Sequence, residues 1–180
     1  GIDHFERIDG AVTCAGISVS GDALNLEEET WAGALAVNLT GPWLAAKSVL
    51  PHLIQQQHGA IVTIASVCGM LACAGNTPYN VTKGGIIQLT RSMASDYAKN
   101  KIRVNSVSPG YITTPMTEVI STYPPAEEAF INMHPLKRPG APSEVASVIA
   151  FLLSDAASFI TAANVPVDGG FSAVKDILIS

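Results

Sequence analysis

The chain of 180 residues is long enough for one domain with a sizeable core, and two full domains would leave each of them small. Hydrophobic residues make up 48% of the chain and charged residues 14%, so we expect part of its surface to be covered by other protein. The net charge of −5 argues against a nucleic-acid partner, and no apolar run reaches the roughly 20 residues that a membrane-spanning helix needs.

Cysteine and histidine spacings argue against a metal site. The three cysteines, Cys14, Cys68 and Cys73, show no Cys-x-x-Cys pair, and the four histidines show no His-x-x-x-His pair. We therefore expect no metal and three reduced, buried thiols, which suits a cytoplasmic protein. Residues 1–7 are charged and lack the apolar core of a signal peptide, which also favours a cytoplasmic location.

Apolar runs of strand length alternate with longer amphipathic stretches. We expect strands at residues 8–15, 61–66, 102–107 and 164–167, separated by helices that begin near Glu27, Trp43, Pro78 and Ser143. This alternation predicts an α/β fold in which about four parallel strands are covered by helices on both faces. With right-handed crossovers, the strands that end at Ser66 and at Pro109-Gly110 would meet at the edge where such folds bind ligands.

Six prolines interrupt the segment of residues 111–142. They are Pro115, Pro124, Pro125, Pro135, Pro139 and Pro142. We expect this segment to be irregular and broken into short pieces, which suits a lid over a substrate better than a core element.

Tyr79 and Lys83 stand four residues apart on the helix expected from Pro78. Residues at this spacing project from one helical face, so a phenol and an ammonium can reach the same pocket. We expect the positive charge to lower the tyrosine pKa from about 10 toward the range where acid–base catalysis is efficient. The alternative is an ordinary amphipathic face, with a buried ring and a lysine head in water. Ser66, at the end of the preceding apolar strand, favours the catalytic interpretation.

Further motifs stand in a fixed order around this pair. In chain order the set is Asn38, Ser66, Tyr79, Lys83, the pair Pro109-Gly110 and the run Asp168-Gly169-Gly170. With these motifs the chain resembles the short-chain dehydrogenase/reductase family, in its Tyr-x-x-x-Lys branch, over nearly its whole length. The resemblance implies a doubly wound Rossmann-type sheet. Residues 1–180 would be the C-terminal part of a single such domain, with residues 111–142 as its lid.

The resemblance implies hydride transfer between a nicotinamide ring and a carbonyl or secondary alcohol. Tyr79 would exchange a proton with the reacting oxygen, and Ser66 would hydrogen-bond that oxygen. Lys83 would lower the pKa of Tyr79 and bind the hydroxyls of the nicotinamide ribose. Asn38 would hold a water that links Lys83 to solvent.

The same resemblance assigns contacts to the cofactor and the substrate. The implied cofactor contacts are Ala15, Gly16, Asn38, Tyr79, Lys83, Pro109, Gly110, Ile112 and Thr114. The implied substrate contacts are Ser66, Cys68, Tyr79 and Tyr111, with Met116, Met133 and the loop 67–77 also lining the pocket.

The chain departs from the family pattern in two places. Thr13-Cys14-Ala15-Gly16 stands where the family has Asn-Asn-Ala-Gly, which puts stability more than catalysis in question. The glycine-rich turn that seats the cofactor pyrophosphate is absent, and with it the residue that selects NAD or NADP. We expect the chain to be the C-terminal part of a longer enzyme, through an incomplete sequence, an unassigned segment or a cleavage. A stand-alone short protein is the alternative.

The leading functional hypothesis is an oxidoreductase that depends on NAD or NADP and acts on a small ketone or polyol, with steroids and acyl thioesters left open. The alternative is a non-catalytic binding or scaffold protein without cofactor binding. The resemblance also implies a homotetramer or dimer, with the helices at residues 43–57 and 78–100 at one interface.

Overall fold

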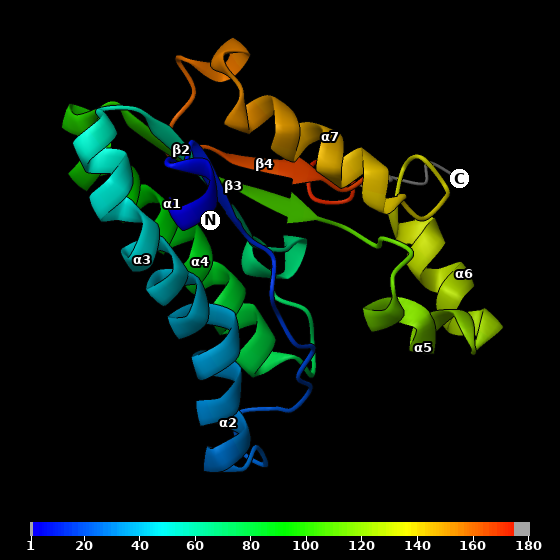
Figure 1. The fold of residues 1–180 in the computed structure, drawn as a ribbon. Coiled ribbons are helices and arrows are strands. Elements are labelled where there is room, and N and C mark those ends of the chain that lie inside the picture. The colour runs from blue at the N-terminus through cyan, green and yellow to red at the C-terminus, as the bar shows by residue number, and fades with distance from the viewer. Residues whose placement is uncertain (1, 175–180) are drawn as a thin grey trace.

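The computed structural model describes residues 2–174 and shows, among them, one parallel sheet of four strands (Figure 1). The strands lie side by side in chain order: β1 (Gly10–Thr13), β2 (Gly59–Ile64), β3 (Ile102–Pro109) and β4 (Asn164–Val167). The expected α/β fold with about four parallel strands is therefore confirmed, although β1 is shorter than the predicted 8–15.

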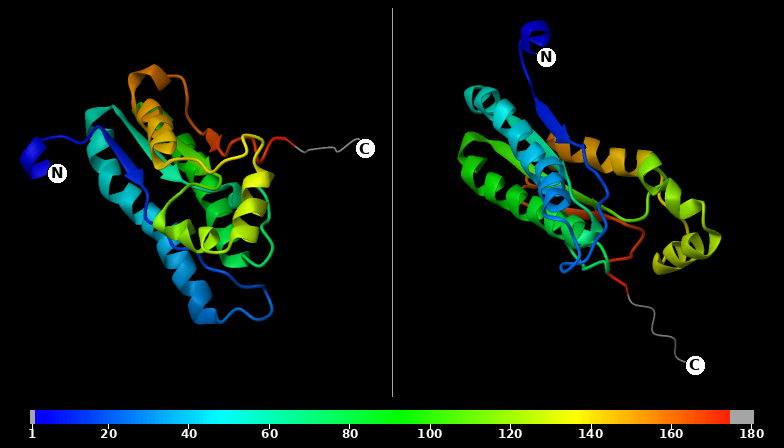
Figure 2. Two further views of the ribbon diagram at one scale, coloured as in Figure 1. Left: turned by 90° about the vertical axis from the view of Figure 1, so that its right-hand side faces the viewer. Right: turned by 90° about the horizontal axis from the view of Figure 1, so that it is seen from below.

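Helices cover both faces of the sheet. They are α1 (Ile2–Phe5), α2 (Glu28–Leu35), α3 (Gly41–Gln56), α4 (Thr77–Tyr97), α5 (Glu118–Ser121), α6 (Pro124–Met133) and α7 (Pro142–Leu153). Helices α3 and α4 lie side by side against one face, and α7 lies against the other (Figure 2). Helices α5 and α6 lie beyond the arrowheads of β3 and β4 (Figure 1). No helix within residues 2–174 combines the length and the apolar character that crossing a bilayer requires.

The two faces carry separate hydrophobic cores because successive residues of a strand point to opposite sides. Ile61 of β2 packs in one cluster with Leu53 of α3 and Met93 of α4. The next residue, Val62, belongs to a second cluster with residues of α7 such as Leu152. β2 is buried along nearly its whole length, as is usual for a central parallel strand. Burial on both faces explains the unbroken apolar run that predicted this strand.

The connection between β3 and β4 departs from the expected handedness. The strand order advances in one direction from β1 to β4, but α7 covers the face opposite to α3 and α4. The last crossover therefore has the opposite hand to the first two, and it is the first two that bring Ser66 and Pro109-Gly110 to one edge of the sheet. The long segment between β3 and α7 carries the chain round to the other face.

The segment 111–142 is more regular than expected. It contains the 3₁₀ turn Pro115–Thr117, helix α5 and the ten-residue helix α6. Pro124 begins α6, at a position where a missing N–H costs no intrahelical hydrogen bond. The prolines of this segment therefore mark helix starts as well as breaks, and the expectation of an irregular segment is wrong.

The cysteines are not three reduced, buried thiols, so that expectation is wrong as well. Cys68 and Cys73 form a disulfide, with their Cα atoms 5.6 Å apart, while Cys14 is free and exposed. Two cysteines five residues apart do not by themselves define a disulfide, so spacing alone did not indicate the pairing. The disulfide lies in the loop between β2 and α4.

The side chain of Arg103 connects β3 to the end of α7 by hydrogen bonds. Its Nη1 donates a hydrogen bond to Leu152 O at 2.6 Å, and its Nη2 donates to Leu153 O at 3.3 Å and Ser154 O at 3.0 Å. The last carbonyls of a helix lack intrahelical partners, and a cation there also interacts well with the helix dipole. One side chain thus joins the sheet to the helix that covers its second face.

Replacing Arg103 by methionine removes these hydrogen bonds and keeps most of the apolar stem. We expect the free energy of unfolding to fall by about 1–3 kcal/mol, the usual range for hydrogen bonds to charged groups. Denaturant unfolding followed by circular dichroism measures the loss. The control is Arg91→Met at an exposed position of α4, which should change stability by less than about 0.5 kcal/mol. Equal effects of the two substitutions would contradict a specific role for Arg103.

Candidate active site

The carboxyl ends of β1, β2 and β3 meet at a cavity of about 430 Å³. Its walls come from the residues that follow each strand, from α4, from the segment after β3 and from α7. The lining residues are Cys14, Gly16, Ile64, Ala65, Ser66, Tyr79, Lys83, Pro109, Gly110, Ile112, Thr114, Pro115, Met116, Thr117, Pro142, Val145, Ala146 and Ile149.

Tyr79 and Lys83 reach this cavity from the first two turns of α4. Pro78 stands at the start of the helix, where its fixed φ is already helical and its missing N–H costs nothing. Both side chains line the cavity, and Lys83 Nζ lies 5.6 Å from the centroid of the Tyr79 ring. The four-residue spacing on α4 therefore brings a phenol and an ammonium to one site.

Lys83 is buried although it carries an ammonium group. Only 5% of the residue is exposed, and Nζ donates a hydrogen bond of 2.8 Å to the main-chain oxygen of Ile64, at the end of β2. Burial lowers the pKa of this ammonium to about 8, and the nearby Cys14 opposes part of that shift. An ammonium has three donors, so two remain for partners in the cavity.

The Tyr79 phenol is pushed toward its protonated form. Burial raises its pKa above the usual value, and a hydrogen bond with Ser66 offsets part of the rise. The net pKa of Tyr79 is therefore raised, and not lowered as expected from the neighbouring Lys83. Desolvation of the phenol dominates, and Lys83 Nζ is held at the Ile64 oxygen.

Ser66 stands where β2 gives way to the 3₁₀ turn Val67–Gly69. Its Oγ accepts a hydrogen bond of 3.2 Å from the N–H of Cys68, so its own proton remains free to be donated into the cavity. The turn packs closely on α4, since a Cβ on Gly69 would stand 2.5 Å from the carbonyl carbon of Lys83. Only glycine permits this approach, which sets how far Ser66 lies from α4.

Asn38 lies behind the cavity, in the π-helical turn Ala36–Thr40 that joins α2 to α3. It is fully buried, its Oδ1 accepts a hydrogen bond from Ile17 N at 2.8 Å, and its Nδ2 donates to Ile17 O at 2.9 Å. A Cβ on Gly16 would stand 3.4 Å from Asn38 Oδ1 and 3.5 Å from Lys83 Nζ. The glycine therefore leaves an open space between these two polar groups, and Asn38 fixes the segment that contains it.

Pro109-Gly110 continues β3 into the cavity wall. A Cβ on Gly110 would meet His134 Nε2 at 2.7 Å and Asp168 Cα at 2.9 Å. The same His134 Nε2 accepts a hydrogen bond of 3.1 Å from the N–H of Tyr111, and His134 Nδ1 lies 2.7 Å from Phe130 O. The main chain at this point is therefore held by contacts with α6 and with the residue that follows β4.

The cavity includes most of the residues assigned from sequence but not all of them. Gly16, Ser66, Tyr79, Lys83, Pro109, Gly110, Ile112 and Thr114 belong to its lining, whereas Ala15, Asn38, Cys68 and Tyr111 do not.

Two of the expected substrate contacts are corrected by the structure. The Tyr111 side chain points to α6, where its Oη donates to Glu127 Oε1 at 3.4 Å and its ring lies 5.7 Å from that of Phe130. Cys68 is bonded to Cys73 in the loop behind Ser66. Met133, also expected at the pocket, is not part of the lining either.

Sequence reasoning missed two parts of the wall. Cys14 was assigned an effect on stability more than on catalysis, although its place directly after β1 puts it at the carboxyl edge of the sheet. Val145 and Ile149 of α7 also line the cavity, and their four-residue spacing marks one helical face.

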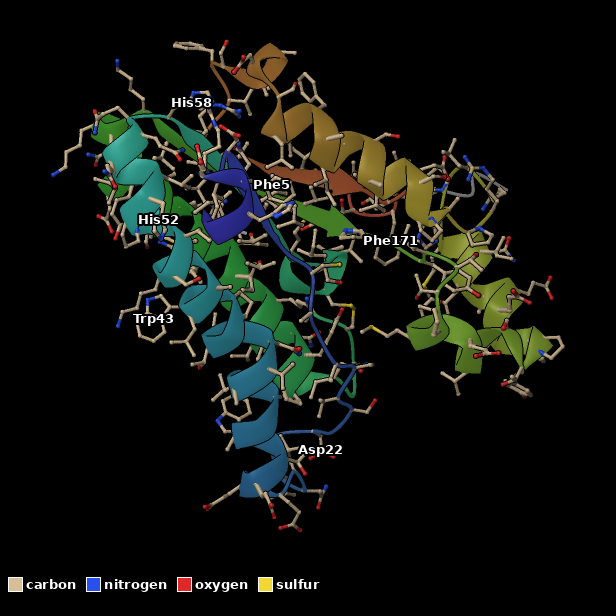
Figure 3. The ribbon with its side chains drawn as sticks, viewed as in Figure 1. Phe5, Asp22, Trp43, His52, His58 and Phe171 are labelled. Carbon is tan, nitrogen blue, oxygen red and sulfur yellow. A yellow bond between two sulfur atoms is a disulfide. The ribbon has the colours of Figure 1, made fainter. Side chains whose placement is uncertain are left out.

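The histidines on the α3 side of the molecule lie away from this cavity. Figure 3 shows His52 on α3 and His58 just before the start of β2, at the opposite end of the strand from Ser66. Neither residue belongs to the cavity wall. Among the residues that the structure describes, no group of three or more His, Cys, Asp or Glu side chains is placed to hold a metal ion.

Known proteins resemble this chain in sequence over nearly all of its length. The family described as enoyl-(acyl carrier protein) reductase matches residues 2–172. The 3-oxoacyl-[acyl-carrier-protein] reductase FabG of Thermotoga maritima is 40% identical over 169 residues, which are 94% of this chain and 68% of that protein. The 2-(R)-hydroxypropyl-CoM dehydrogenase of Xanthobacter autotrophicus is 36% identical over 176 residues, which are 96% of this chain and 70% of that protein.

Solved structures show the same fold. A gluconate 5-dehydrogenase from Burkholderia cenocepacia, in complex with NADP and tartrate, matches 97% of this chain with 70% of its own, at a TM-score of 0.92 and 32% identity. A levodione reductase matches the same shares of the two chains at a TM-score of 0.91 and 36% identity. Together with the motifs gathered around the cavity, these similarities show that the chain belongs to the short-chain dehydrogenase/reductase family of oxidoreductases.

Proposed function

We propose that this protein transfers a hydride between a nicotinamide cofactor and a carbonyl or secondary alcohol, with Tyr79 as general acid and base. The observation that carries the proposal is the meeting of two hydroxyls, those of Tyr79 and Ser66, with the ammonium of Lys83 in the wall of one cavity. Two hydroxyls that line one cavity can together bind one substrate oxygen. Similar structures with bound NADP support a nicotinamide cofactor, and NAD and NADP both remain candidates.

A bound nicotinamide ring supplies the hydride in reduction and accepts it in oxidation. Ser66, whose Oγ is already held by an N–H group, donates its own proton in a hydrogen bond to the substrate oxygen as negative charge develops there. Tyr79 transfers its proton to the same oxygen and so completes the alcohol. The raised pKa keeps the phenol protonated at neutral pH, which suits this direction of the reaction. In oxidation the tyrosinate accepts the alcohol proton.

Lys83 has two roles in the proposed reaction. Beyond its bond to Ile64 O, Nζ has donors for the ribose hydroxyls of the cofactor, and the space beside Gly16 fits such a group. Its positive charge also stabilises the tyrosinate that remains after proton transfer. Asn38 keeps Gly16 in place through its bonds to Ile17, and its Oδ1 has a second lone pair for the relay water.

The remaining cofactor contacts in the proposal come from two stretches of main chain. Residues 15–16 follow β1 and would face the adenosine side. Pro109, Gly110, Ile112 and Thr114 line the cavity after β3 and would face the carboxamide. The close packing of Gly110 against His134 and Asp168 supports this assignment, because main chain held on one side by such contacts presents a fixed surface on the other.

We propose a small ketone or polyol as the substrate. The lid segment and α7 contribute apolar side chains to the cavity, among them Ile112, Met116, Val145 and Ile149, which suit an apolar body beside the carbonyl. The names of similar proteins refer to reduction of 3-oxoacyl groups and of levodione and to dehydrogenation of gluconate. An acyl thioester is therefore the second candidate.

We propose that the protein forms a homo-oligomer, a dimer or a tetramer, through the outer face of α3 and α4. A groove between these helices is lined by apolar side chains that include Trp43, Ile54, Leu89 and Tyr97. Figure 3 shows Trp43 on the outer side of α3, where it is partly exposed. Exposed apolar surface of this kind is typical of protein interfaces.

Tyr79→Phe removes the proposed acid and base but retains the ring. We expect kcat/KM for ketone reduction to fall by roughly 10²–10⁴-fold, the usual contribution of a general acid, with unchanged circular dichroism. Oxidation of NADH or NADPH with a panel of ketones, followed by absorbance, measures the rate. Tyr97→Phe, later on the same helix, is the matched control and should retain the rate. A Tyr79→Phe enzyme with full activity would refute the assignment.

The lowered pKa of Lys83 predicts how the stability of the protein depends on pH. Its pKa in the folded protein is about 8, whereas an unfolded lysine titrates near 10.4. Between these values the unfolded chain binds the proton that the folded chain has lost, so this group makes the free energy of unfolding increase with pH. We expect an increase on the order of 1–3 kcal/mol from pH 7 to pH 10 that Lys83→Met lacks.

Urea unfolding at several pH values measures this difference. Lys99→Met, at an exposed site after α4, is the control and should show the same increase as the parent protein. If Lys83→Met and the parent protein respond alike to pH, the lowered pKa of Lys83 is contradicted.

Cofactor binding distinguishes the proposed enzyme from the alternative, a non-catalytic scaffold. We expect addition of the chain to change the fluorescence of NADH or NADPH, and Lys83→Met to weaken that response because the ribose loses its donors. A chain that unfolds cooperatively in denaturant yet leaves the fluorescence of both nucleotides unchanged would favour the scaffold and reject the enzyme for these 180 residues.

A further inference from the structure

A disulfide closes the loop that joins the two proposed catalytic hydroxyls. Ser66 follows β2, Tyr79 lies in the first turn of α4, and Cys68 and Cys73 are bonded to each other between them. The proposed reaction makes no use of either sulfur atom. Their place in the chain nevertheless puts a covalent bond between the segments that carry the two hydroxyls.

The Cys68 end of the bond is tied to Ser66. The main-chain N–H of Cys68 donates to Ser66 Oγ at 3.2 Å, so the position of Cys68 sets the direction in which the serine proton is donated. Cys68 also lies in the 3₁₀ turn whose Gly69 is packed against the main chain of Lys83. A shift of Cys68 would therefore change the position of the Ser66 hydroxyl.

The Cys73 end of the bond is tied to the residue next to Tyr79. Asn80 Nδ2 donates to Cys73 O at 2.9 Å, and Cys73 N donates to Asn80 Oδ1 at 3.4 Å. Asn80 follows Tyr79 directly in the first turn of α4. The disulfide therefore links the main chain that holds Ser66 to the main chain held beside Tyr79.

Within the loop, no main-chain hydrogen bond joins these two ends, although the 3₁₀ turn also packs on α4 where Gly69 meets Lys83. The main-chain bonds of Met70 and Leu71 return to Val67 within the first turn, whereas those around Asn76 stay within the second half or reach Gly21. Residues 70–72 and 74–75 are exposed. The two halves of the loop are thus locally ordered, and the disulfide is a direct connection between them.

We propose that the Cys68–Cys73 disulfide is a positioning element, which holds the Ser66 hydroxyl in register with the Tyr79 phenol and whose reduction slows the chemical step. This inference rests on the proposed function of Ser66 and Tyr79. Both cysteines are half-buried, so a small thiol can reach the bond from solvent.

The reduction is an ordinary exchange with a dithiol. One thiolate of the reductant attacks a sulfur of the pair, the Cys68–Cys73 bond breaks, and a mixed disulfide forms. The second thiol of the reductant then displaces the protein sulfur. Two electrons and two protons end on the cysteine thiols, and the dithiol leaves as its own cyclic disulfide.

The experiment compares the oxidised protein with protein treated with dithiothreitol and freed of it anaerobically. Thiol titration should give one free thiol before treatment, that of Cys14, and three after it. We expect reduction to lower kcat by about tenfold, less than the roughly 10²-fold that a displacement of 1 Å can cost. KM for the nicotinamide cofactor should stay within about twofold because Lys83 and Gly110 are not displaced. Reoxidation should restore kcat.

Two variants make the result specific. The double variant Cys68→Ala with Cys73→Ala should show the kcat of the reduced protein and no response to dithiothreitol. Cys14→Ser, compared with its own untreated form, should respond to dithiothreitol as the parent protein does. Circular dichroism and thermal unfolding at the assay temperature show whether each form is folded.

Each outcome bears on a different claim. Equal kcat in the oxidised and reduced proteins would overturn the positioning role and leave the proposed function intact. A lower kcat that comes with lost helicity or with an equally weakened cofactor site would also overturn it, in favour of a general role in folding. Absence of turnover in both forms would instead refute the proposed function. Three titratable thiols in the untreated protein would show that the bond does not form.

Discussion

The site depends on one ammonium group that is kept out of water at the end of a central strand. Lys83 Nζ donates to the main-chain oxygen of Ile64, and its desolvation appears as a pKa of about 8. Gly69 makes room for the main chain of this lysine, and Gly16 lies near its ammonium, where a Cβ would be 3.5 Å from Nζ. The segments that follow β1 and β2 are therefore arranged around a single cation, and the neighbouring phenol takes its place relative to that cation.

Burial acts on the pKa values of the phenol and the ammonium in opposite directions, and in both cases it favours the neutral form. It raises the pKa of Tyr79 and lowers that of Lys83 to about 8, so the lysine value, ordinarily slightly above that of tyrosine, now lies below it. A buried site of this kind disfavours a tyrosinate that has no cation nearby. A charged lysine near the phenol would favour the tyrosinate, so the proposed proton transfer from Tyr79 is easier while Lys83 keeps its own proton.

The parts of the structure that could be predicted are those that a periodic pattern determines. β2 was identified because both of its faces are buried, and α4 because its apolar residues repeat on one face. The direction of the Tyr111 side chain could not be predicted, because it depends on a hydrogen bond to Glu127 of α6. The prolines at the start of α6 had suggested an irregular segment there instead of a helix. The disulfide could not be predicted for the same reason. These features depend on which segments come together in the folded chain, and a local sequence pattern does not contain that information.

The packing at Gly110 has a consequence for how this protein can change through mutation. Three segments converge on that residue, namely the end of β3, His134 after α6 and Asp168 after β4, and none of them leaves room for a methyl group. A substitution of His134 or Asp168 that alters the stability of the fold would also move the main chain at the cavity. Thermal tolerance and ligand affinity are therefore linked at this junction, and selection for one of them would constrain the other.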